Sequence, residues 1–317
     1  MNVLLVGCGN IAISYIKVIQ DLNVDYQIIG NSEENSKEFS NNHKCKVISG
    51  GLYNGYNELC KQPTHAIIAT PINILAENAL FLIEKGVKNI LIEKPGALNK
   101  QDLFLIKRSA ENKKVKVFIA YNRRFYASIN ELLELTSNEK ITSIFFEFTE
   151  WSHMLVNKNL PKFKLENWFI ANSTHLVDLA FYIGGRPKNW CTYIQSKLDW
   201  HPKGSIFVGS GITERDIMFS YHANWNAPGS WRVEVSTAKN KYILRPIEEL
   251  KVQKHGNIEN EEIKLNSQLD TFYKPGFYKQ LESFLTHPED KRLLTINEAI
   301  RNFEIFDKML SKINEVK

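Results

Sequence analysis

The first residues suited to chemistry form the segment Gly7-Cys8-Gly9-Asn10-Ile11-Ala12, which fits the pattern G-x-G-x-x-A. It stands between an apolar run, Val3–Val6, and a helix-like stretch. Gly7 permits a tight turn, and Gly9 lets the backbone approach a pyrophosphate. The helix N-terminus that follows offers free N–H groups to phosphates. We therefore expect dinucleotide contacts from Gly7, Gly9, Asn10 and Ile11, with an ordinary strand-to-helix turn as the alternative.

The end of the second predicted strand bears on which dinucleotide is bound. Tyr26–Ile29 is followed by Gly30-Asn31-Ser32, where NAD enzymes usually place an acidic residue on the ribose. Asn31 and Ser32 can both hydrogen-bond to a 2′-phosphate, and no carboxylate is present to repel one. No arginine follows directly, and a simple turn is the alternative. We expect NADP or NAD as the cofactor, with a slight preference for NADP.

A lysine and a histidine could move the proton that accompanies hydride transfer. Lys94 lies in Glu93-Lys94-Pro95, directly after the apolar strand Asn89–Ile92, and parallel sheets bind ligands beyond the carboxyl ends of their strands. His175 shares a helix face with Asp178. A lysine near a nicotinamide, or a histidine, can act as the base for alcohol oxidation. A surface charge at Lys94 and a structural role for His175 are the alternatives.

Arginines and aromatic residues could bind the substrate. Arg123 and Arg124 can meet a carboxylate or phosphate in bidentate fashion, although a surface or interdomain ion pair is an equal alternative for at least one of them. Aromatic faces suit sugars and nucleobases, but most are expected in a sheet core or a subunit interface. These residues are Trp151, His153, Trp168, Tyr182, Trp225 and Trp231. Asn224–Gly229 is expected to be a loop between paired strands.

Alternating strand and helix patterns must position the residues up to about 120. Apolar runs such as Val3–Val6 and His65–Ala69 alternate with amphipathic helices, which implies a parallel sheet covered on both faces. Later strands, from Asn189–Ile194 to Lys241–Leu244, follow one another without helices, which suggests a mostly antiparallel sheet. We expect a dinucleotide-binding domain at 1–120 and a substrate domain at 121–317, with the last helix as a candidate to pack on the first domain.

Composition narrows the class of protein. The chain has 317 residues, 43% of them hydrophobic and 24% charged, and a formal net charge of +5, which is typical of a globular protein. Its four cysteines form no Cys-x-x-Cys pair and no zinc spacing with histidine. No signal peptide, membrane-spanning stretch or dense basic patch is apparent. We expect a cytoplasmic protein with no metal, no membrane association and no nucleic-acid partner.

Four motifs occur in the order seen in one known family. They are the glycine segment, Ala69-Thr70-Pro71, Glu93-Lys94-Pro95 and His175-Leu176-Val177-Asp178-Leu179. With Tyr121-Asn122-Arg123-Arg124-Phe125, they make the chain resemble the glucose–fructose oxidoreductase / inositol dehydrogenase (Gfo/Idh/MocA) family. The resemblance implies an N-terminal Rossmann domain with a doubly wound parallel sheet. It also implies a C-terminal open-faced, mostly antiparallel sheet with helices on one face, which often pairs subunits into homodimers or homotetramers.

The resemblance also implies roles for single residues. Lys94 and His175 would be the catalytic acid and base, and Lys94 would contact both cofactor and substrate. Thr70 and Pro71 would lie along the cofactor, and Glu93 near the nicotinamide ribose. Substrate contacts are expected from Tyr121, Arg123, Arg124, Asn172, His175 and Asp178. One departure stands out, since many members carry an aspartate where this chain has Ala171, which leaves the division of labour between Lys94 and His175 open.

The expected activity is hydride transfer between NAD(P) and a sugar hydroxyl or ketone. The basic balance and the arginines fit a nucleotide-activated or acidic sugar, and the chain looks similar to family members that serve surface-polysaccharide synthesis. Two alternatives remain: a non-catalytic NAD(P)-binding regulator, and an enzyme that uses the cofactor transiently for epimerisation or elimination. Retention of Lys94 together with His175 argues against a regulator.

Overall fold

The computed structural model describes residues 1–156, 158 and 160–311. The chain divides into two compact units. Unit 1 comprises residues 1–125 and 269–303, and unit 2 comprises 126–268 and the chain from Glu304. The predicted boundary after residue 120 lies close to the observed one. The prediction of one continuous domain at 121–317 differs from the structure, because 269–303, including the first part of the last helix, return to unit 1.

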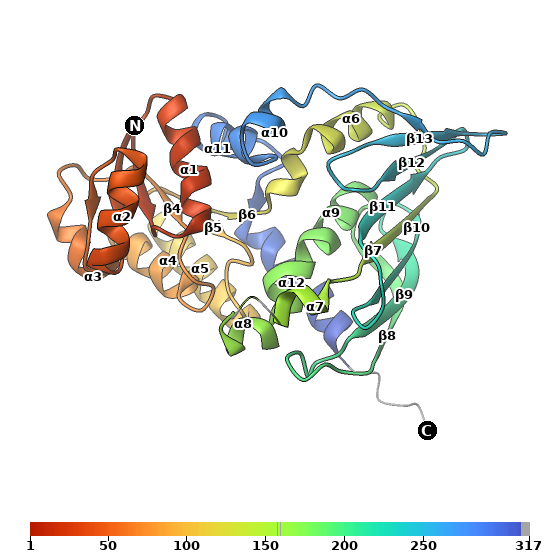
Figure 1. Cartoon of the computed structure of the whole chain (residues 1–317), viewed down its shortest axis with the longest axis horizontal. Helices are drawn as coiled ribbons and strands as arrows, with labels where there is room; N and C mark the ends of the chain where they lie inside the picture. Colours follow the sequence, from red (N-terminus) through yellow and green to blue (C-terminus); the bar gives the residue numbers. More distant parts are fainter. Residues whose placement is uncertain (157, 159, 312–317) are drawn as a thin grey trace. The chain divides into compact units, whose positions relative to one another are not determined.

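Unit 1 contains a seven-stranded sheet with the order β15-β6-β5-β4-β1-β2-β3. Figure 1 labels three of its strands, β4, β5 and β6. The six strands before β15 run parallel, and β15 pairs antiparallel with β6. This order, with β1 next to β4, is that of a doubly wound dinucleotide-binding sheet. The strands are β1 (Asn2–Val6), β2 (Asp25–Ile29), β3 (Val47–Ile48), β4 (His65–Ile68), β5 (Asn89–Glu93), β6 (Lys116–Ala120) and β15 (Leu294–Thr295).

Helices pack on the sheet of unit 1 through their apolar residues. The helices are α1 (Asn10–Asp21), α2 (Glu33–His43), α3 (Gly51–Gly55), α4 (Leu75–Glu84), α5 (Lys100–Lys113) and α11 (Phe277–Thr286). The apolar residues of α11 recur at Phe277, Leu281 and Phe284, as on one face of a helix, and they join α1 in a core with Phe118 of β6. Burial of this face explains why the segment 269–303 returns to unit 1.

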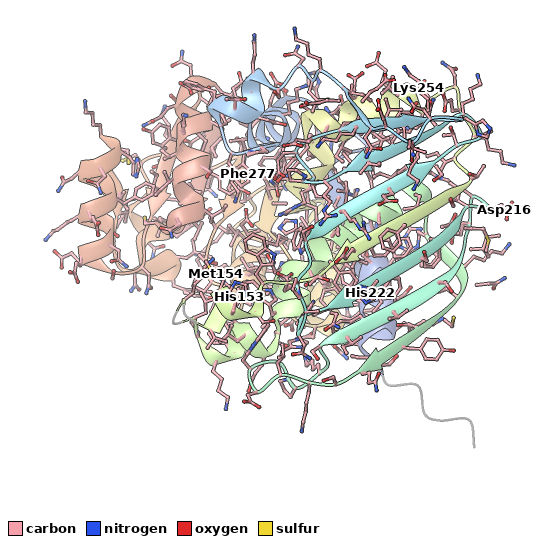
Figure 2. All side chains as sticks on the ribbon, turned by 45° about the vertical axis from the view of Figure 1, so that its right-hand side comes forward. His153, Met154, Asp216, His222, Lys254 and Phe277 are labelled. Carbon is pink, nitrogen blue, oxygen red and sulfur yellow. The ribbon has the colours of Figure 1, made fainter. Side chains whose placement is uncertain are left out.

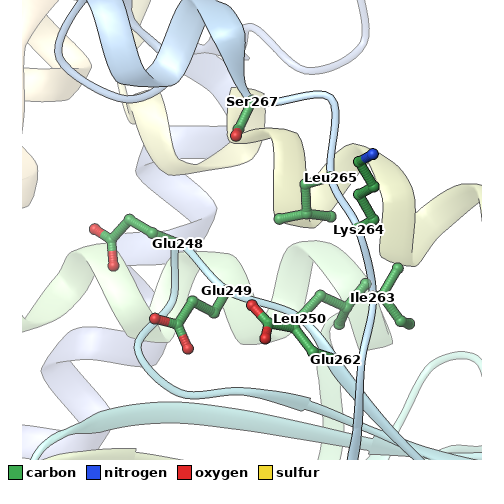
Figure 3. Close-up of a pocket in the computed structure, with 8 residues that line it drawn as sticks. All are labelled: Glu248, Glu249, Leu250, Glu262, Ile263, Lys264, Leu265 and Ser267. Atoms are coloured by element: carbon green, nitrogen blue, oxygen red, sulfur yellow. The ribbon is translucent and has the colours of Figure 1, made fainter.

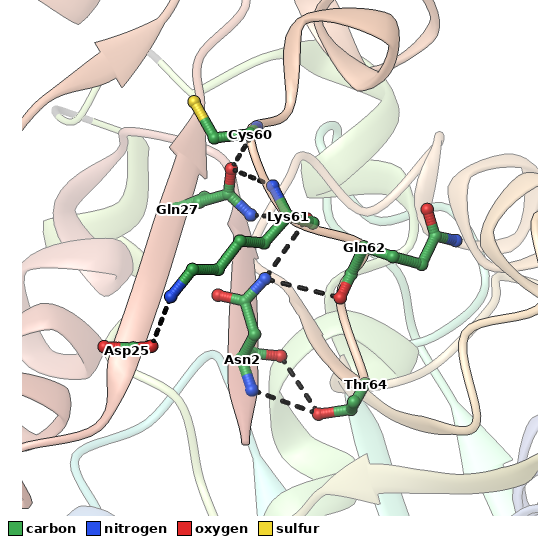
Figure 4. A network of polar contacts seen from close by, with 7 residues as sticks. All are labelled: Asn2, Asp25, Gln27, Cys60, Lys61, Gln62 and Thr64. Carbon is green, nitrogen blue, oxygen red and sulfur yellow. Dashed lines mark hydrogen bonds and ion pairs between the residues drawn. The ribbon is translucent and has the colours of Figure 1, made fainter.

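A polar network fixes the amino-terminal ends of β1 and β2 (Figure 4). Gln27 accepts a hydrogen bond from the Cys60 backbone N–H at 2.7 Å and donates to the Lys61 carbonyl at 2.7 Å. The Lys61 ammonium pairs with Asp25 at 2.9 Å. Asn2 bonds to the Lys61 carbonyl at 3.2 Å. The network lies at the sheet edge opposite the glycine turn, so its role is to hold the strands in register.

Unit 2 contains an eight-stranded sheet with the order β14-β13-β12-β11-β7-β10-β9-β8. Its neighbouring strands are antiparallel except for β7 and β10, which run parallel. Since β7 separates β10 from β11, the prediction that Asn224–Gly229 joins paired strands is wrong. The strands are β7 (Ser143–Phe148), β8 (Pro187–Gln195), β9 (Ile206–Thr213), β10 (Met218–Asn224), β11 (Trp231–Ser236), β12 (Asn240–Leu244), β13 (Lys251–Lys254) and β14 (Glu261–Glu262).

One face of the unit 2 sheet is covered by helix and the other is open. Helix α9 (Thr174–Gly184) packs on β7 and β11. Along β10, exposed and buried residues alternate, with His222 on the exposed face (Figure 2), as expected for a sheet that faces solvent on one side. The other helices of unit 2 include α6 (Ala127–Leu135), α7 (Ser152–Val156) and α8 (Lys162–Glu166). All but the first residue of α10 (Gln268–Phe272) belongs to unit 1, and α12 (Ile296–Leu310) begins in unit 1 and ends in unit 2. Both predicted sheet types are therefore confirmed.

None of the described helices has the length and apolar character needed to cross a membrane.

An open pocket in unit 2 carries three glutamates, Glu248, Glu249 and Glu262 (Figure 3). Glu249 pairs with Lys251 at 3.4 Å. Among the described residues, no group of three or more histidines, cysteines or carboxylates has an arrangement that could hold a metal ion.

Candidate active site

The carboxyl ends of the parallel strands bring the predicted unit 1 residues to one edge of the sheet. Val6 of β1 pairs with Ile68 of β4, which pairs with Ile92 of β5. Glu93 then pairs with Ala120 of β6. The residues that follow these strands therefore emerge side by side, as in other doubly wound sheets that bind ligands there.

The glycine turn has the geometry that its motif predicts. Gly7 has φ of +114°, and a Cβ at this position would lie 2.4 Å from the Ala69 carbonyl oxygen. Its N–H donates to the Ile29 carbonyl at 2.8 Å. At Gly9, in contrast, a Cβ would meet no protein atom within 4 Å. Gly7 is thus required by the fold itself, whereas the absence of a side chain at Gly9 leaves open space beside the start of α1.

A cavity of about 670 Å³ lies against this turn, within the usual range for ligand pockets. Six residues predicted to contact the cofactor line it: Gly7, Gly9, Asn31, Ser32, Thr70 and Pro71. Asn10 and Ile11 belong to the first turn of α1 and do not line this cavity, and neither do Glu93 and Lys94. The wall also contains residues that sequence reasoning missed: Cys8, Asn35, Gly50–Asn54, Ile74, Glu77 and Asn78.

The loop before α3 forms one wall of the cavity. Gly50 and Gly51 both have positive φ, +97° and +83°, a conformation that glycine adopts without strain. Beyond them, Tyr53 donates to Glu77 at 2.7 Å, and its ring meets Phe81 edge-on at 4.6 Å. Two adjacent glycines after a strand were the sequence signal that could have indicated this wall.

Polar residues line the cavity after β2, and two acidic residues follow them along the chain. Ser32 caps α2, its hydroxyl accepting from the Asn35 N–H at 3.3 Å. Glu33 and Glu34 follow in the first turn of α2, and Glu33 pairs with Lys37 at 2.6 Å. Asn31 lies across from Gly51, where a Cβ would be 3.2 Å from the Asn31 Oδ1 atom.

Glu93 is a buried carboxylate next to Lys94. Tyr15 of α1 donates to its Oε1 atom at 2.7 Å. Burial raises the pKa of Glu93, while the charges of Lys94 and Lys274 and the Tyr15 hydrogen bond oppose this. Burial, followed by the charge of Glu93, also raises the pKa of Tyr15 well above its usual value. The structure therefore anchors the residue before Lys94 rigidly to helix α1.

Lys274, which sequence reasoning missed, joins this cluster from the returning segment. Burial lowers its pKa, and the charges of Glu93 and Arg123 act on it in opposite directions. Its Nζ atom lies 4.8 Å from the ring centroid of Phe277. The Asn122 side chain donates to the Pro275 carbonyl at 2.9 Å, which ties the segment to the 3₁₀ helix Asn122–Phe125. A distant lysine brought in by folding leaves no local sequence signal.

The predicted substrate residues after β6 differ in exposure. Tyr121 and Arg124 are buried, at 2% and 4% exposed, while Arg123 is half-buried. Burial of Arg124 is consistent with a structural ion-pair or hydrogen-bonding role for one of the two arginines. Arg123, beside Lys274, is the better placed of the two to meet an anionic group.

In unit 2, the predicted residues cluster around the start of α9. His175 and Asp178 lie on this helix and are buried. A π-helical turn, Phe169–Ser173, precedes it, and such turns are frequent at functional sites. Ala171 and Asn172 belong to this turn. The sequence therefore predicted that His175 and Asp178 share one helix, but it did not predict the π-helical turn before that helix.

A second buried carboxylate, Glu150, contacts this turn. The Asn172 amide donates to both oxygens of Glu150, at 3.0 and 3.1 Å, and the Ser173 hydroxyl donates at 2.6 Å. Glu150 follows β7 and is 7% exposed. Sequence reasoning missed it, although a charged residue two positions after an apolar strand, next to Trp151, was a usable signal.

Comparison with known proteins agrees with this geometry. Residues 1–121 match the model of the oxidoreductase family with an NAD-binding Rossmann fold (GFO_IDH_MocA). Glucose-6-phosphate 3-dehydrogenase from Bacillus subtilis is 24% identical over 193 residues, which cover 56% of this chain and 52% of the relative. The chain thus spans about half the length of this curated relative.

Solved structures share the fold over nearly the whole chain. An NAD-binding oxidoreductase from Klebsiella pneumoniae superposes with a TM-score of 0.80 at 12% identity, covering 100% of this chain and 97% of that one. The WlbA dehydrogenase from Chromobacterium violaceum, solved with NADH and UDP-GlcNAcA, gives a TM-score of 0.73 at 13% identity, covering 98% and 92%.

Proposed function

Because residues 1–121 match the model of the oxidoreductase family with an NAD-binding Rossmann fold, we propose that the chain is an NAD(P)-dependent sugar dehydrogenase or ketoreductase. The observation that carries the proposal is the cavity beside the glycine turn. Its floor is open at Gly9, where a side chain would intrude, and its walls are the residues that follow β1, β2 and β4. These features fit the pyrophosphate and adenosine parts of a dinucleotide.

Lys94 and His175 are proposed as the groups that move the proton. Oxidation of a sugar hydroxyl releases a hydride, which a bound nicotinamide accepts, and a proton, which requires a base. Lys94 directly follows Glu93, which is held by Tyr15, so its backbone is fixed at the sheet edge. His175 is buried on α9 with Asp178 three residues later, a spacing that lets a carboxylate orient an imidazole.

The proposed substrate is a nucleotide-activated or acidic sugar. Arg123 and Lys274 supply positive charge close to Lys94, and arginine suits phosphate or carboxylate groups. The named relatives support this class, since one is a glucose-6-phosphate 3-dehydrogenase and another was solved with UDP-GlcNAcA. The family resemblance extends the proposal to surface-polysaccharide synthesis.

NADP remains the proposed cofactor, with NAD as the alternative. Asn31 lines the cavity at the end of β2 without the carboxylate typical of NAD enzymes. Glu33 and Glu34 nearby favour NAD, because their charges repel a 2′-phosphate. Replacement Asn31→Asp places a carboxylate at the ribose, so we expect it to weaken NADPH binding more than NADH binding.

Fluorescence titration of the purified protein with NADH and NADPH tests the proposal. Each nucleotide is then combined with a panel of UDP-sugars, CMP-sugars and free sugars. We expect one nucleotide to bind and one sugar to oxidise or reduce it. Nucleotide binding without turnover on any sugar would favour a regulator, and a nucleotide that stays bound through purification would favour transient use. If protein that has been freed of nucleotide binds neither NADH nor NADPH, the proposal is overturned.

A further inference from the structure

Unit 2 contains a second cavity, also of about 670 Å³, that none of the motifs indicated. Two segments line it: the residues that follow β7 and the loop between β10 and β11. The first supplies Glu150, Trp151, Ser152 and His153, and the second supplies residues 225–229. His153 lies on α7, where Figure 2 labels it. The cavity combines aromatic side chains with one buried carboxylate, a mixture typical of small-molecule sites.

Trp151 presents a fixed aromatic surface to this cavity. It is 58% exposed, yet its indole N–H donates to the Gly229 carbonyl at 2.7 Å. The ring of His153 lies nearly parallel to it, with 6.4 Å between centroids and an interplanar angle of 20°. An exposed tryptophan held in one orientation loses little conformational freedom when a ligand covers it.

Glu150 provides an acceptor at the wall of the same cavity. Its carboxylate is held by the Asn172 amide and the Ser173 hydroxyl at 2.6 to 3.1 Å. An ionised carboxylate only accepts hydrogen bonds, so it selects ligand groups that donate. Hydroxyl groups fit this requirement, whereas phosphate or carboxylate groups of a ligand would be repelled.

The loop opposite is fixed before any ligand binds. Trp225 is 2% exposed, its indole N–H donates to the Phe148 carbonyl at 3.2 Å, and its ring stacks on Trp200 at 5.8 Å and 3°. The Ser152 hydroxyl donates to the Trp225 carbonyl at 2.5 Å, which joins the two walls. The cavity is therefore preorganised, and preorganised sites bind without the cost of ordering a loop.

We propose that this cavity binds an uncharged, hydroxyl-bearing pyranose ring of the substrate, with Glu150 accepting from a ring hydroxyl and Trp151 covering a C–H face. The inference rests on the proposed function, because it takes the substrate to be a sugar. It adds that the hydroxyl face of the sugar is recognised by unit 2 through two residues that no motif assigned.

Two substitutions test the proposal without disturbing the cofactor cavity. Glu150→Gln keeps the size of the side chain but removes its charge, and Trp151→Ala removes the aromatic surface. Matched controls are Glu249→Gln, a half-buried carboxylate outside this cavity, and Phe104→Ala, an aromatic residue 47% exposed on α5. Equal melting temperatures and equal nucleotide Kd values would establish that the variants are folded.

Calorimetric titration with glucose, glucose 6-phosphate and UDP-GlcNAc, with and without nucleotide, supplies the readout. We expect Glu150→Gln and Trp151→Ala each to raise the Kd of the bound sugar about tenfold or more, with both controls unchanged. Turnover would show the same change in KM, with a smaller change in kcat.

The outcomes separate the two proposals. If the wild-type protein binds nucleotide and sugar but both variants bind the sugar with unchanged Kd, the ring-binding role is overturned while the proposed function stands. If the wild-type protein binds nucleotide but no sugar of the panel, the ring-binding role is also overturned. Failure of the wild-type protein to bind either nucleotide would overturn the proposed function, and sugar binding that depends on Glu150 and Trp151 would still support the cavity.

Discussion

Lys94 is held at the sheet edge by its neighbour Glu93, whose carboxylate is buried and bonded to Tyr15. We expect Lys94→Ala to leave the nucleotide Kd nearly unchanged, since Lys94 does not line the glycine-turn cavity. Loss of a general acid or base typically lowers turnover by about 10²–10⁴-fold, and steady-state kinetics at saturating nucleotide would measure this.

The matched control for this substitution is Lys88→Ala. Lys88 is exposed just before β5, whereas Lys94 follows the other end of that strand. Lys88→Ala should change neither turnover nor nucleotide affinity. A collapse of nucleotide affinity in Lys94→Ala, with turnover of the saturated enzyme unchanged, would contradict the assigned role.

We expect His201 to make the stability of unit 2 depend on pH. It is fully buried, and its Nδ1 atom contacts the Gly204 carbonyl at 2.6 Å. Burial lowers the pKa of His201 from 6.5 to about 4. The unfolded chain therefore binds a proton more readily between these values, and folding stability is present above pH 6.5 and falls as the pH drops towards 4. The loss from this group is about 3 kcal/mol.

Urea unfolding at pH 7 and pH 4, followed by tryptophan fluorescence, checks the histidine prediction. Other groups also titrate in this range, so the comparison is between wild type and His201→Gln, in which the pH-dependent difference should shrink by about 3 kcal/mol. The exposed His255, replaced by Gln, should behave as wild type. An equal pH dependence in all three proteins would refute the assignment.

At the scale of elements, the junction of β1 and α1 separates a folding role from a binding role. A Cβ at Gly9 meets no protein atom within 4 Å, and Gly9 has φ of −86°. We expect Gly9→Ala to change the free energy of unfolding by less than about 1 kcal/mol. The added methyl group would occupy the space proposed for the pyrophosphate, so nucleotide affinity should fall at least about tenfold.

Gly86→Ala is the matched control for the glycine turn. Gly86 also has open space around its Cβ position, but its φ is +83°, so alanine there costs about 1–2 kcal/mol of stability. It should leave nucleotide binding intact. Thermal unfolding should show a loss of stability in Gly86→Ala, and nucleotide titration should show a loss of affinity in Gly9→Ala. If Gly9→Ala leaves the nucleotide affinity unchanged, the pyrophosphate does not bind at this position.

At the scale of the whole molecule, the open face of the unit 2 sheet is the predicted oligomer interface. Tyr193 of β8, Val208 of β9 and His222 of β10 lie in register across it, and all three are exposed. One chain has a mass of 36.6 kDa. We expect light scattering after size exclusion to give two or four times this mass, and Val208→Lys to lower it, because a lysine buried in an interface loses its hydration.

Ile258→Lys provides the control for the interface. Ile258 is 90% exposed in the turn between β13 and β14, so the same apolar-to-lysine change there should leave the mass unchanged. A wild-type protein with the mass of one chain would contradict the predicted homodimer or homotetramer.

Features that depend on neighbours along the chain could be predicted from the sequence. The glycine turn, the apolar strands of unit 1 and the position of Lys94 after β5 follow from local spacing, because a strand–turn–helix unit is specified within a few tens of residues. For the same reason, His175 and Asp178 could be placed on one helix. These local features sufficed to predict both sheet types and six of the residues that line the glycine-turn cavity.

Contacts between distant segments could not be predicted from the sequence and are known from the structure. The return of residues 269–303 brings Lys274 to Glu93, and the parallel pairing of β7 with β10 separates the strands on either side of the loop 225–229. Glu150 meets Asn172 and Ser173 in the same way. Burial of apolar faces such as that of α11 drives these contacts, and this driving force is non-directional. The sequence pattern therefore shows that a face will be buried, but not which segment it will pack against.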